Sequence, residues 1–335
     1  MTTRELDAAG ITGPARVGYL VAGDLLQAKA RARGAPFLVR HLVAAHKRPY
    51  LEVLFAFLTY LDDIVDDRTR SIDARLRRLD RLEAAFTTAA QDHHTPNGAG
   101  ADAEGGGLPK GLEAEERVNG ALVRALVHFM RTWDLPVHEA GEYLEAQRRI
   151  LTQREYATYE ELEKEYLEPM APPAIWANTF FEPLTAESHA LCRNATTSFQ
   201  LIDFLWDLRE DLALGHLFLP LDRLAAFDLD RESVERQLEH GPLSPALCDL
   251  LAAEVERAGA LLASAVDWPK TVDPAVRPFV EWDIAMNRLK LAELRRGAFD
   301  DLVRRSVTSR SFKARAMART LLDIGRAVNG WRALT

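Results

Sequence analysis

Apolar side chains recur at three- and four-residue intervals through most of the chain, which is typical of amphipathic α-helices. Alternating apolar and polar residues, the pattern of a strand, do not form a convincing segment. The clearest helical segments cover residues 48–67, 72–90, 112–132, 137–156, 183–213, 243–265, 274–296 and 310–329. Ser71 and Ser309 stand where N-caps belong, Pro136 suits a first helical position, and Gly330 suits a C-terminal stop. The pattern predicts an all-α protein.

Residues 93–111 interrupt the helical pattern with a glycine-rich, low-complexity sequence, which we expect to be a mobile surface loop. Elsewhere we find no composition shift that marks a domain boundary and no internal repeat. Residues 1–335 are therefore interpreted as a single domain. No Gly-x-Gly-x-x-Gly fingerprint follows a strand, so the sequence does not support a dinucleotide site.

The composition argues against several classes of protein. The 335 residues carry a net charge of −8, which argues against a nucleic-acid partner because phosphate backbones bind basic surfaces. Two cysteines, Cys192 and Cys248, cannot form a disulfide framework. The N-terminal residues do not resemble a signal peptide, and no apolar run approaches the roughly 18 residues of a membrane helix. We expect a soluble, cytoplasmic protein without a membrane anchor.

Two acidic stripes stand out within the helical pattern. Asp62 and Asp66 are four residues apart in Tyr60-Leu-Asp-Asp-Ile-Val-Asp-Asp67, and Asp203, Asp207 and Asp211 repeat that spacing. On a helix this spacing stacks side chains one turn apart on one face. Like charges so placed destabilise an isolated helix, and both stripes lie in apolar sequence, where unpartnered carboxylates are costly to bury.

A divalent cation would compensate these charges. Mg²⁺ is usually held by one or two carboxylates together with phosphate oxygens of a substrate. The stripes therefore predict that Mg²⁺ and a diphosphate bind to Asp62, Asp66, Asp207 and Asp211. The alternative is that each stripe is a solvated helix face.

At these residues the sequence resembles the squalene/phytoene synthase family of isoprenoid enzymes, from about residue 36 to about residue 320. The family motif Asp-x-x-x-Asp matches Asp62 and Asp66. A second motif, Gln-x-x-Asn-x-x-Arg-Asp-x-x-x-Asp followed by Gly-Arg and an aromatic-x-Pro, is similar to the stretch from Gln200 to Asp211 and to Gly215-His-Leu-Phe-Leu-Pro220. The resemblance implies an all-α isoprenoid synthase fold, a single helical bundle around a central cavity.

Two more segments are similar to family motifs. Tyr166-Leu-Glu-Pro-Met-Ala-Pro-Pro173 resembles Tyr-x-x-x-Val-Ala-Gly-x-x-Gly, which implies that Tyr166 lies near the reacting cation. A core tyrosine is the alternative. The segment with Arg305 and Lys313 resembles a basic segment that reaches substrate phosphates, although each residue taken alone also fits a solvated surface position.

Several positions depart from family members that join two prenyl diphosphates head to head. Three arginines of those enzymes are replaced by Thr59, Trp206 and His216, their asparagine by Asp203, and their Gly-x-x-Gly by a proline pair at 172–173. A hydrogen bond to a charged group contributes about 1.5–3 kcal/mol. Losing three would weaken a second diphosphate site by roughly 5 kcal/mol or more, which is at least about a thousandfold in affinity.

The sequence therefore favours one prenyl diphosphate donor and a non-ionic second substrate, unless Arg40, Lys47 or Arg48 compensates for the lost arginines. The resemblance extends to family members of actinobacterial secondary metabolism that prenylate aromatic metabolites, including carbazoles. We interpret the chain as a Mg²⁺-dependent aromatic prenyltransferase that moves a dimethylallyl or similar group to an electron-rich aromatic acceptor. A head-to-head synthase and a class I terpene cyclase are the alternatives.

Remaining roles follow from this interpretation. Gln200, Asp203 and Trp206 are expected to contact substrate, with Trp206 stacking on the acceptor or, alternatively, packing in the core. His216 is the candidate base for the ring proton, although it could instead donate a hydrogen bond to phosphate or cap a helix end. Asp203 is a second candidate base unless it binds metal, and the departing diphosphate is a third.

Overall fold

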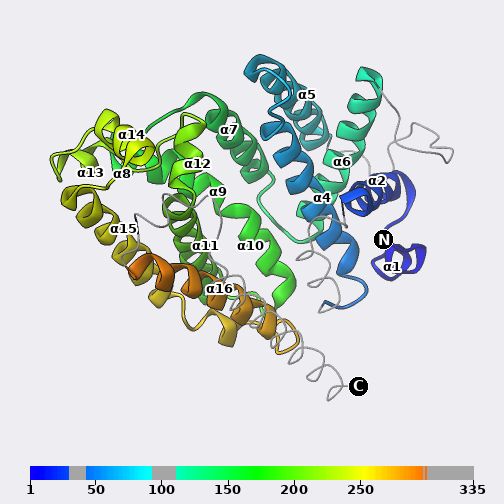
Figure 1. Ribbon diagram of the computed structural model, residues 1–335. Coiled ribbons are helices and arrows are strands. Elements are labelled where there is room, and N and C mark those ends of the chain that lie inside the picture. The colour runs from blue at the N-terminus through cyan, green and yellow to red at the C-terminus, as the bar shows by residue number, and fades with distance from the viewer. Residues whose placement is uncertain (30–42, 93–110, 297–298, 300–335) are drawn as a thin grey trace. The chain divides into compact units, whose positions relative to one another are not determined.

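Every regular element of the described residues is a helix (Figure 1). The computed structural model describes residues 1–29, 43–92, 111–296 and 299, and in this part of the chain the predicted all-α class is confirmed. The chain divides into two compact units, Met1–Leu151 and Thr152–Thr335, which are taken in turn. The expectation of one continuous domain stays a prediction.

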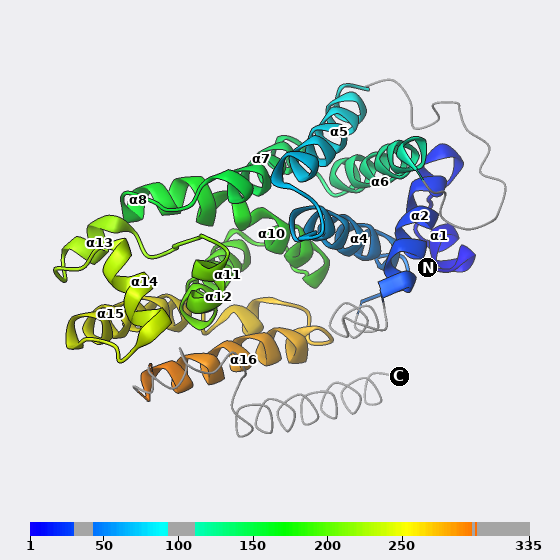
Figure 2. The same ribbon diagram turned by 45° about the horizontal axis from the view of Figure 1, so that its top comes forward.

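The first unit is built around one long helix that three others contact. Its helices are α1 (Thr3–Ala8), α2 (Gly13–Lys29), α4 (Arg48–Val65), α5 (Ile72–Gln91), α6 (Leu112–Thr132) and α7 (His138–Thr152), the last ending at the boundary. Helices α2, α4 and α5 pack against α6 (Figure 2). Gly18 lets α2 approach closely, since an added Cβ would lie 2.3 Å from the Ala121 carbonyl oxygen.

Local sequence explains where these helices begin and end. Ser71 caps α5 by accepting a hydrogen bond from the Ala74 N–H, as its position predicts. Helix α7 begins at His138, two residues after Pro136, and stops at Thr152 instead of the predicted 156. Beyond it the chain makes long-range backbone hydrogen bonds: Arg154 O accepts from Leu217 N–H and Tyr156 O from Leu221 N–H.

The second unit is also helical and centres on α11. Its elements are α8 (Tyr159–Leu162), a π-helix η1 (Glu163–Leu167), α9 (Glu168–Met170), α10 (Pro172–Asn178), η2 (Thr179–Phe181), α11 (Ala186–Trp206), α12 (Leu208–Ala213), α13 (Leu221–Ala225), α14 (Arg231–His240), α15 (Pro245–Ser264), η3 (Trp268–Thr271) and α16 (Arg277–Arg295). Helix α11 packs against α10, α15 and α16. Ile202 and Cys192 of α11 are fully buried in this contact.

The predicted helix over 183–213 is two helices. Helix α11 ends at Trp206, and Asp207, with φ −104° and ψ 11°, leads into α12. The spacing of the second stripe survives this break, because Asp207 N–H still donates to Asp203 O (2.8 Å) and Asp211 N–H to Asp207 O (2.9 Å). The predicted helix 310–329, Ser309, Gly330 and all but the last residue of the glycine-rich segment 93–111 lie outside the described residues.

None of the described helices combines the length and the apolar character needed to cross a bilayer.

Candidate active site

The first acidic stripe occupies the last turn of α4. Asp62 is half-buried inside the helix, whereas Asp66 is exposed and forms the C-cap, with its N–H donating to Asp62 O at 2.7 Å. The C-terminal end of a helix carries partial negative charge, so carboxylates there are unfavourable without a nearby cation. The position makes this stripe a binding point for positive charge.

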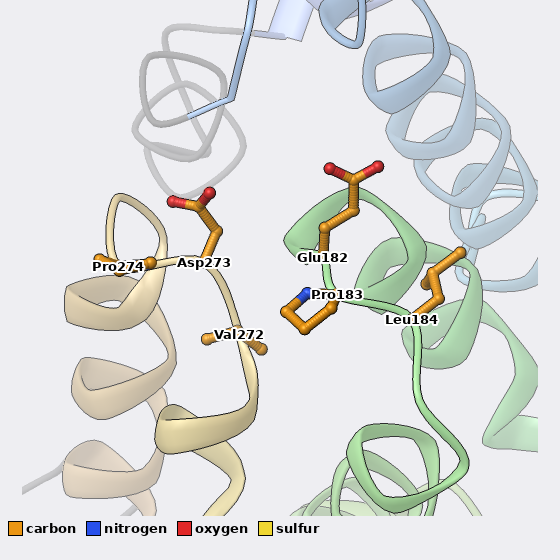
Figure 3. A pocket seen from close by; sticks show the side chains of 6 residues that line it. All are labelled: Glu182, Pro183, Leu184, Val272, Asp273 and Pro274. Atoms are coloured by element: carbon orange, nitrogen blue, oxygen red, sulfur yellow. The ribbon is translucent and has the colours of Figure 1, made fainter.

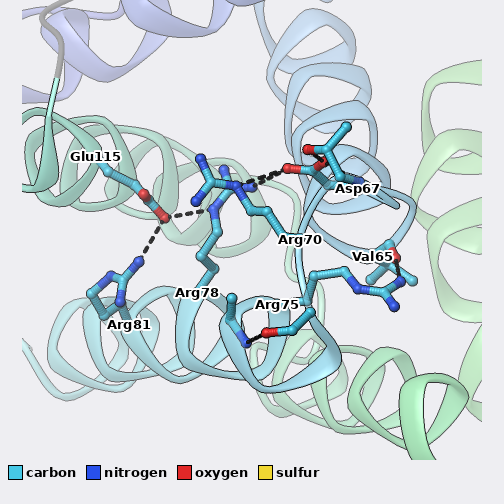
Figure 4. Close-up of polar contacts among 10 residues, drawn as sticks. Val65, Asp67, Arg70, Arg75, Arg78, Arg81 and Glu115 are labelled. Carbon is cyan, nitrogen blue, oxygen red and sulfur yellow. Dashed lines mark hydrogen bonds and ion pairs between the residues drawn. The ribbon is translucent and has the colours of Figure 1, made fainter.

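Arginines surround the end of α4 (Figure 4). Arg75 donates from Nη1 to the Val65 carbonyl at 2.6 Å and so satisfies one of the last carbonyls of the helix. Arg70 pairs with Asp67 at 2.9 Å, and Arg78 joins Asp67 (3.8 Å) to Glu115 (2.9 Å). These contacts place compensating positive charge beside the stripe, on α5 and the turn before it.

Two of the basic residues considered as replacements for the lost arginines are described. Arg48 forms an ion pair with Glu5 at 3.2 Å and donates to the Val43 carbonyl, which fastens α1 to α4. Lys47 is 9% exposed, with its ammonium 5.8 Å from the centre of the Trp133 ring. Arg40 lies outside the described residues.

The second stripe lies at the junction of α11 and α12. Burial and the neighbouring Asp203 raise the pKa of Asp207. Burial, followed by the charges of Asp207 and Glu210, raises the pKa of Asp211 to about 7. The three carboxylates of the stripe therefore repel one another in a partly desolvated place.

Lys290 of α16 forms an ion pair with Asp203. Its charge also counteracts the rise in the pKa of Asp207. Sequence reasoning missed this residue, although polar positions at 283, 287 and 290 in a helix with a buried apolar face were a usable signal. Asp203 thus already has an ion-pair partner, whereas burial and the neighbouring acids outweigh Lys290 at Asp207 and also raise the pKa of Asp211.

The donor set fits a cation shared with a substrate. Within the described ranges, no three histidine, cysteine or acidic side chains gather closely enough to hold a metal ion on their own. Mg²⁺ does not need such a cage, because it commonly binds one or two carboxylates and completes its shell with water and phosphate oxygens. Each stripe offers two carboxylates of that kind.

Aromatic rings cluster next to the second stripe. Tyr166 lies on the π-helix η1, an element frequent at functional sites. Its ring forms T-shaped pairs with Phe204 and Phe218, both with centroids at 5.1 Å, and Phe204 stacks on Phe218 at 4.2 Å. Phe204 and Phe218 were not predicted as site residues; the aromatic-x-Pro match at Phe218 was the available signal.

His216 is held on both sides of its ring. Gly215, with φ +86°, turns the chain so that the imidazole reaches the segment before it. Nε2 lies 3.0 Å from Arg154 Nη1 and Nδ1 lies 3.1 Å from the Gln153 carbonyl. A guanidinium can only donate and a carbonyl can only accept, so the ring is neutral and carries its proton on Nδ1.

The other predicted residues are placed as follows. Gln200 and Trp206 lie on α11, both half-buried, and Trp206 is the last residue of that helix. Arg305 and Lys313 lie outside the described residues.

A pocket in the second unit lies away from this chemistry (Figure 3). Its volume is about 540 Å³, and it is lined by Glu182, Pro183, Leu184, Val272, Asp273 and Pro274. These residues precede α11 and α16, whereas Asp207 follows the far end of α11. With a rise of 1.5 Å per residue, the 21 residues of α11 separate the two places by roughly 30 Å. The pocket is not part of the candidate active site.

Comparison with known proteins agrees with the fold. The chain is similar to squalene synthase HpnC from Alicyclobacillus acidocaldarius, with 22% identity, a TM-score of 0.67, and 87% of this chain and 98% of that chain covered. It is also similar to a dehydrosqualene synthase solved in complex with a ligand, with 14% identity, a TM-score of 0.65, and coverage of 96% and 99%. The predicted isoprenoid synthase fold is confirmed. No curated protein sequence matches the chain.

A sequence model of the family described as squalene/phytoene synthase matches residues 33–313, a span that includes both acidic stripes, Tyr166 and His216. This span is most of the chain, and the family's members process prenyl diphosphates. The chain therefore belongs to the squalene/phytoene synthase family.

Proposed function

We propose that the protein is a Mg²⁺-dependent aromatic prenyltransferase. It would transfer a dimethylallyl or similar group from one prenyl diphosphate to an electron-rich aromatic acceptor such as a carbazole. Asp62 and Asp66 would be one pair of metal ligands, and Asp207 and Asp211 would be another. Family membership alone is equally consistent with head-to-head condensation, so the choice rests on the second substrate.

The main support for a non-ionic second substrate is the lack of positive charge on His216. Head-to-head enzymes resembling this chain have an arginine there, and here a neutral imidazole uses both nitrogens for hydrogen bonds to Arg154 and the Gln153 carbonyl. Such a ring provides no charge for a second diphosphate. Trp206 and Thr59, at two further arginine positions, are uncharged as well. An apolar or weakly polar second substrate fits these replacements better than a second anion.

The bound metal would supply neutralisation of the negative charge that develops on the departing diphosphate. The residues of the chain account for the other requirements. The apolar surroundings of the second stripe keep water from an allylic cation, and the rings of Tyr166, Phe204 and Phe218 offer electron-rich surface beside it. A carbon–oxygen bond of the donor breaks, a ring carbon of the acceptor forms the new carbon–carbon bond, and the ring proton leaves.

The proton needs an acceptor. His216 would have to give up its hydrogen bond with Arg154 to bind it at Nε2, and Asp203 is already paired with Lys290. The released diphosphate is the remaining base, and it lies beside the reacting carbon when the bond forms.

The test combines products and stoichiometry. The protein is incubated with Mg²⁺, dimethylallyl or geranyl diphosphate, and carbazole, and products are identified by mass spectrometry. We expect a prenylated carbazole and little donor consumption when carbazole is omitted. Equilibrium dialysis with a non-hydrolysable donor analogue should saturate at one molecule per chain.

Other outcomes identify the alternatives. Consumption of the donor alone to a cyclic hydrocarbon or alcohol would make the protein a terpene cyclase. Two bound analogues per chain, with a dimeric prenyl product, would make it a head-to-head synthase.

A further inference from the structure

Helix α16 carries a row of polar side chains beside its buried apolar face. Asp283, Asn287 and Lys290 are spaced four and three residues apart, which places them on one side. Lys290 pairs with Asp203, so this side is turned toward α11. Asp203 lies one helical turn before Asp207, and the polar face therefore borders the second acidic stripe.

Asn287 is the least satisfied member of this face. The residue is 6% exposed, and its Nδ2 donates to the Asp283 carbonyl at 3.1 Å and lies 3.5 Å from Asp283 Oδ1. Its Oδ1 is buried without a hydrogen-bond partner in the described part of the chain. A buried oxygen without a donor is unfavourable, and such atoms call for a ligand or a functional explanation.

Asp283 adds a second acceptor next to that oxygen. Burial raises the pKa of Asp283 to about 7, the nearby Lys290 opposes the rise, and Asp203 adds to it. The same side of α16 thus presents a buried amide oxygen and a poorly solvated carboxyl group, and both would accept hydrogen bonds.

We propose that Asn287 and Asp283 recognise a hydrogen-bond donor on the second substrate, an N–H or O–H group of the aromatic acceptor. This inference rests on the proposed function and adds the acceptor's chemical class: an aromatic N-heterocycle or a phenol. A plain aromatic hydrocarbon would leave the Asn287 oxygen unsatisfied. A site that hydrogen-bonds a substrate N–H or O–H rejects analogues that lack it.

Isosteric probe pairs test this directly. Carbazole and fluorene have the same shape, but fluorene has CH₂ in place of the N–H; 1-naphthol and 1-methylnaphthalene differ likewise at an O–H. Binding of each probe to the full-length protein, with the donor analogue and Mg²⁺ present, is followed by the fluorescence of the probe. We expect the wild type to bind the member that carries the N–H or O–H group roughly tenfold more tightly in at least one pair. The pair that shows this preference tells whether the acceptor's hydrogen-bonding group is an N–H or an O–H.

Variants assign the preference to the two residues. Asn287→Leu removes the oxygen at similar volume and should bring the binding ratio close to one. Asp283→Asn keeps an acceptor oxygen but loses the charge, so the ratio should fall part of the way. Arg288→Ala, on the exposed side of the same helix, is the matched control and should leave the ratio unchanged. Circular dichroism establishes that each variant is folded.

A wild type that binds both members of each pair equally would overturn the inference, as would an unchanged ratio in a folded Asn287→Leu variant. If Asn287→Leu does not fold, an unchanged ratio in Asp283→Asn serves the same purpose. Since probe binding is measured without turnover, its result is independent of the proposed reaction. Discrimination without prenylated product would contradict only the proposed function.

Discussion

The two acidic stripes lie at the C-terminal ends of helices of similar length, 18 residues in α4 and 21 in α11, but the charged residues around them differ. Arg75 bonds the last turn of α4, and Arg70 and Arg78 pair with Asp67 beside it. The second stripe has Glu210 next to Asp211 and, from α16, a single described lysine bonded to Asp203.

Carboxylates at the same four-residue spacing can therefore have different electrostatic surroundings. Near the first stripe, arginines compensate acidic charge before any ligand arrives. At the second stripe, burial and mutual repulsion raise the pKa values of Asp207 and Asp211, so the charged cluster opposes folding until a cation binds. A ligand that binds only the folded state adds its binding free energy to stability. Mg²⁺ with a diphosphate should therefore stabilise the second unit more than the first.

The largest expected effect comes from removing one carboxylate of each stripe. Asp62→Asn and Asp207→Asn should each lower turnover by at least about a hundredfold, because each removes a metal-ligand charge. Their stabilities should differ: without metal, Asp207→Asn relieves repulsion and should raise the melting temperature, whereas Asp62→Asn should not. Diphosphate release and thermal melting in chelator measure the two effects.

Glu210→Gln is the matched control, because it removes a neighbouring negative charge that is exposed and lies off the stripe. It should keep its turnover. Equal melting shifts for the two aspartate variants would break the contrast between the stripes, and full activity in a metal-stripped sample would remove the metal mechanism.

A second prediction uses Asp283, which borders the second stripe. Its pKa is about 7 in the folded protein against an ordinary 3.8, so between these values the folded state holds a proton that the unfolded state has lost. The free energy of unfolding therefore falls as pH rises from about 4 to about 7. Asp283→Asn should flatten this dependence and gain on the order of 2 kcal/mol over the wild type at pH 8. Urea unfolding at pH 5 and pH 8 measures it, and parallel curves would refute it.

Tyr166 should show a smaller effect on stability. Tyr166→Phe keeps the ring contacts with Phe204 and Phe218 and should melt like the wild type, whereas Tyr166→Leu loses about 0.5–1.5 kcal/mol per aromatic pair. Comparing kcat for the two variants separates hydroxyl from ring. A large loss already present in Tyr166→Phe assigns a catalytic role to the hydroxyl; a loss confined to Tyr166→Leu leaves packing or ring electrostatics.

The smallest effect is expected at His216. Both ring nitrogens are hydrogen-bonded within the protein, so His216→Gln should stay within about tenfold of the wild-type rate and keep its pH profile, at saturating donor and acceptor. Loss of one limb of the pH–rate profile in the variant would identify His216 as the base. A coincident profile leaves the released diphosphate in that role.

Much of the fold was predictable because helix formation is read from short-range periodicity. The predicted segments 72–90 and 112–132 correspond closely to α5 and α6. The break at Asp207 and the early end of α7 were not predictable from short-range periodicity, and the segment after α7 bonds through the carbonyls of Arg154 and Tyr156 to residues more than 60 positions later.

The sequence by itself determined the all-α class, the two acidic stripes and the family, since each depends on residues a few positions apart. Only the tertiary structure decided what surrounds each charge. Lys290 pairs with Asp203 although 87 residues separate them in the sequence. After the turn at Gly215, His216 lies against Arg154 and Phe218 stacks on Phe204. Spacing sets which side chains share a helix face, but burial and the charges packed around them set their pKa values, and both follow from packing.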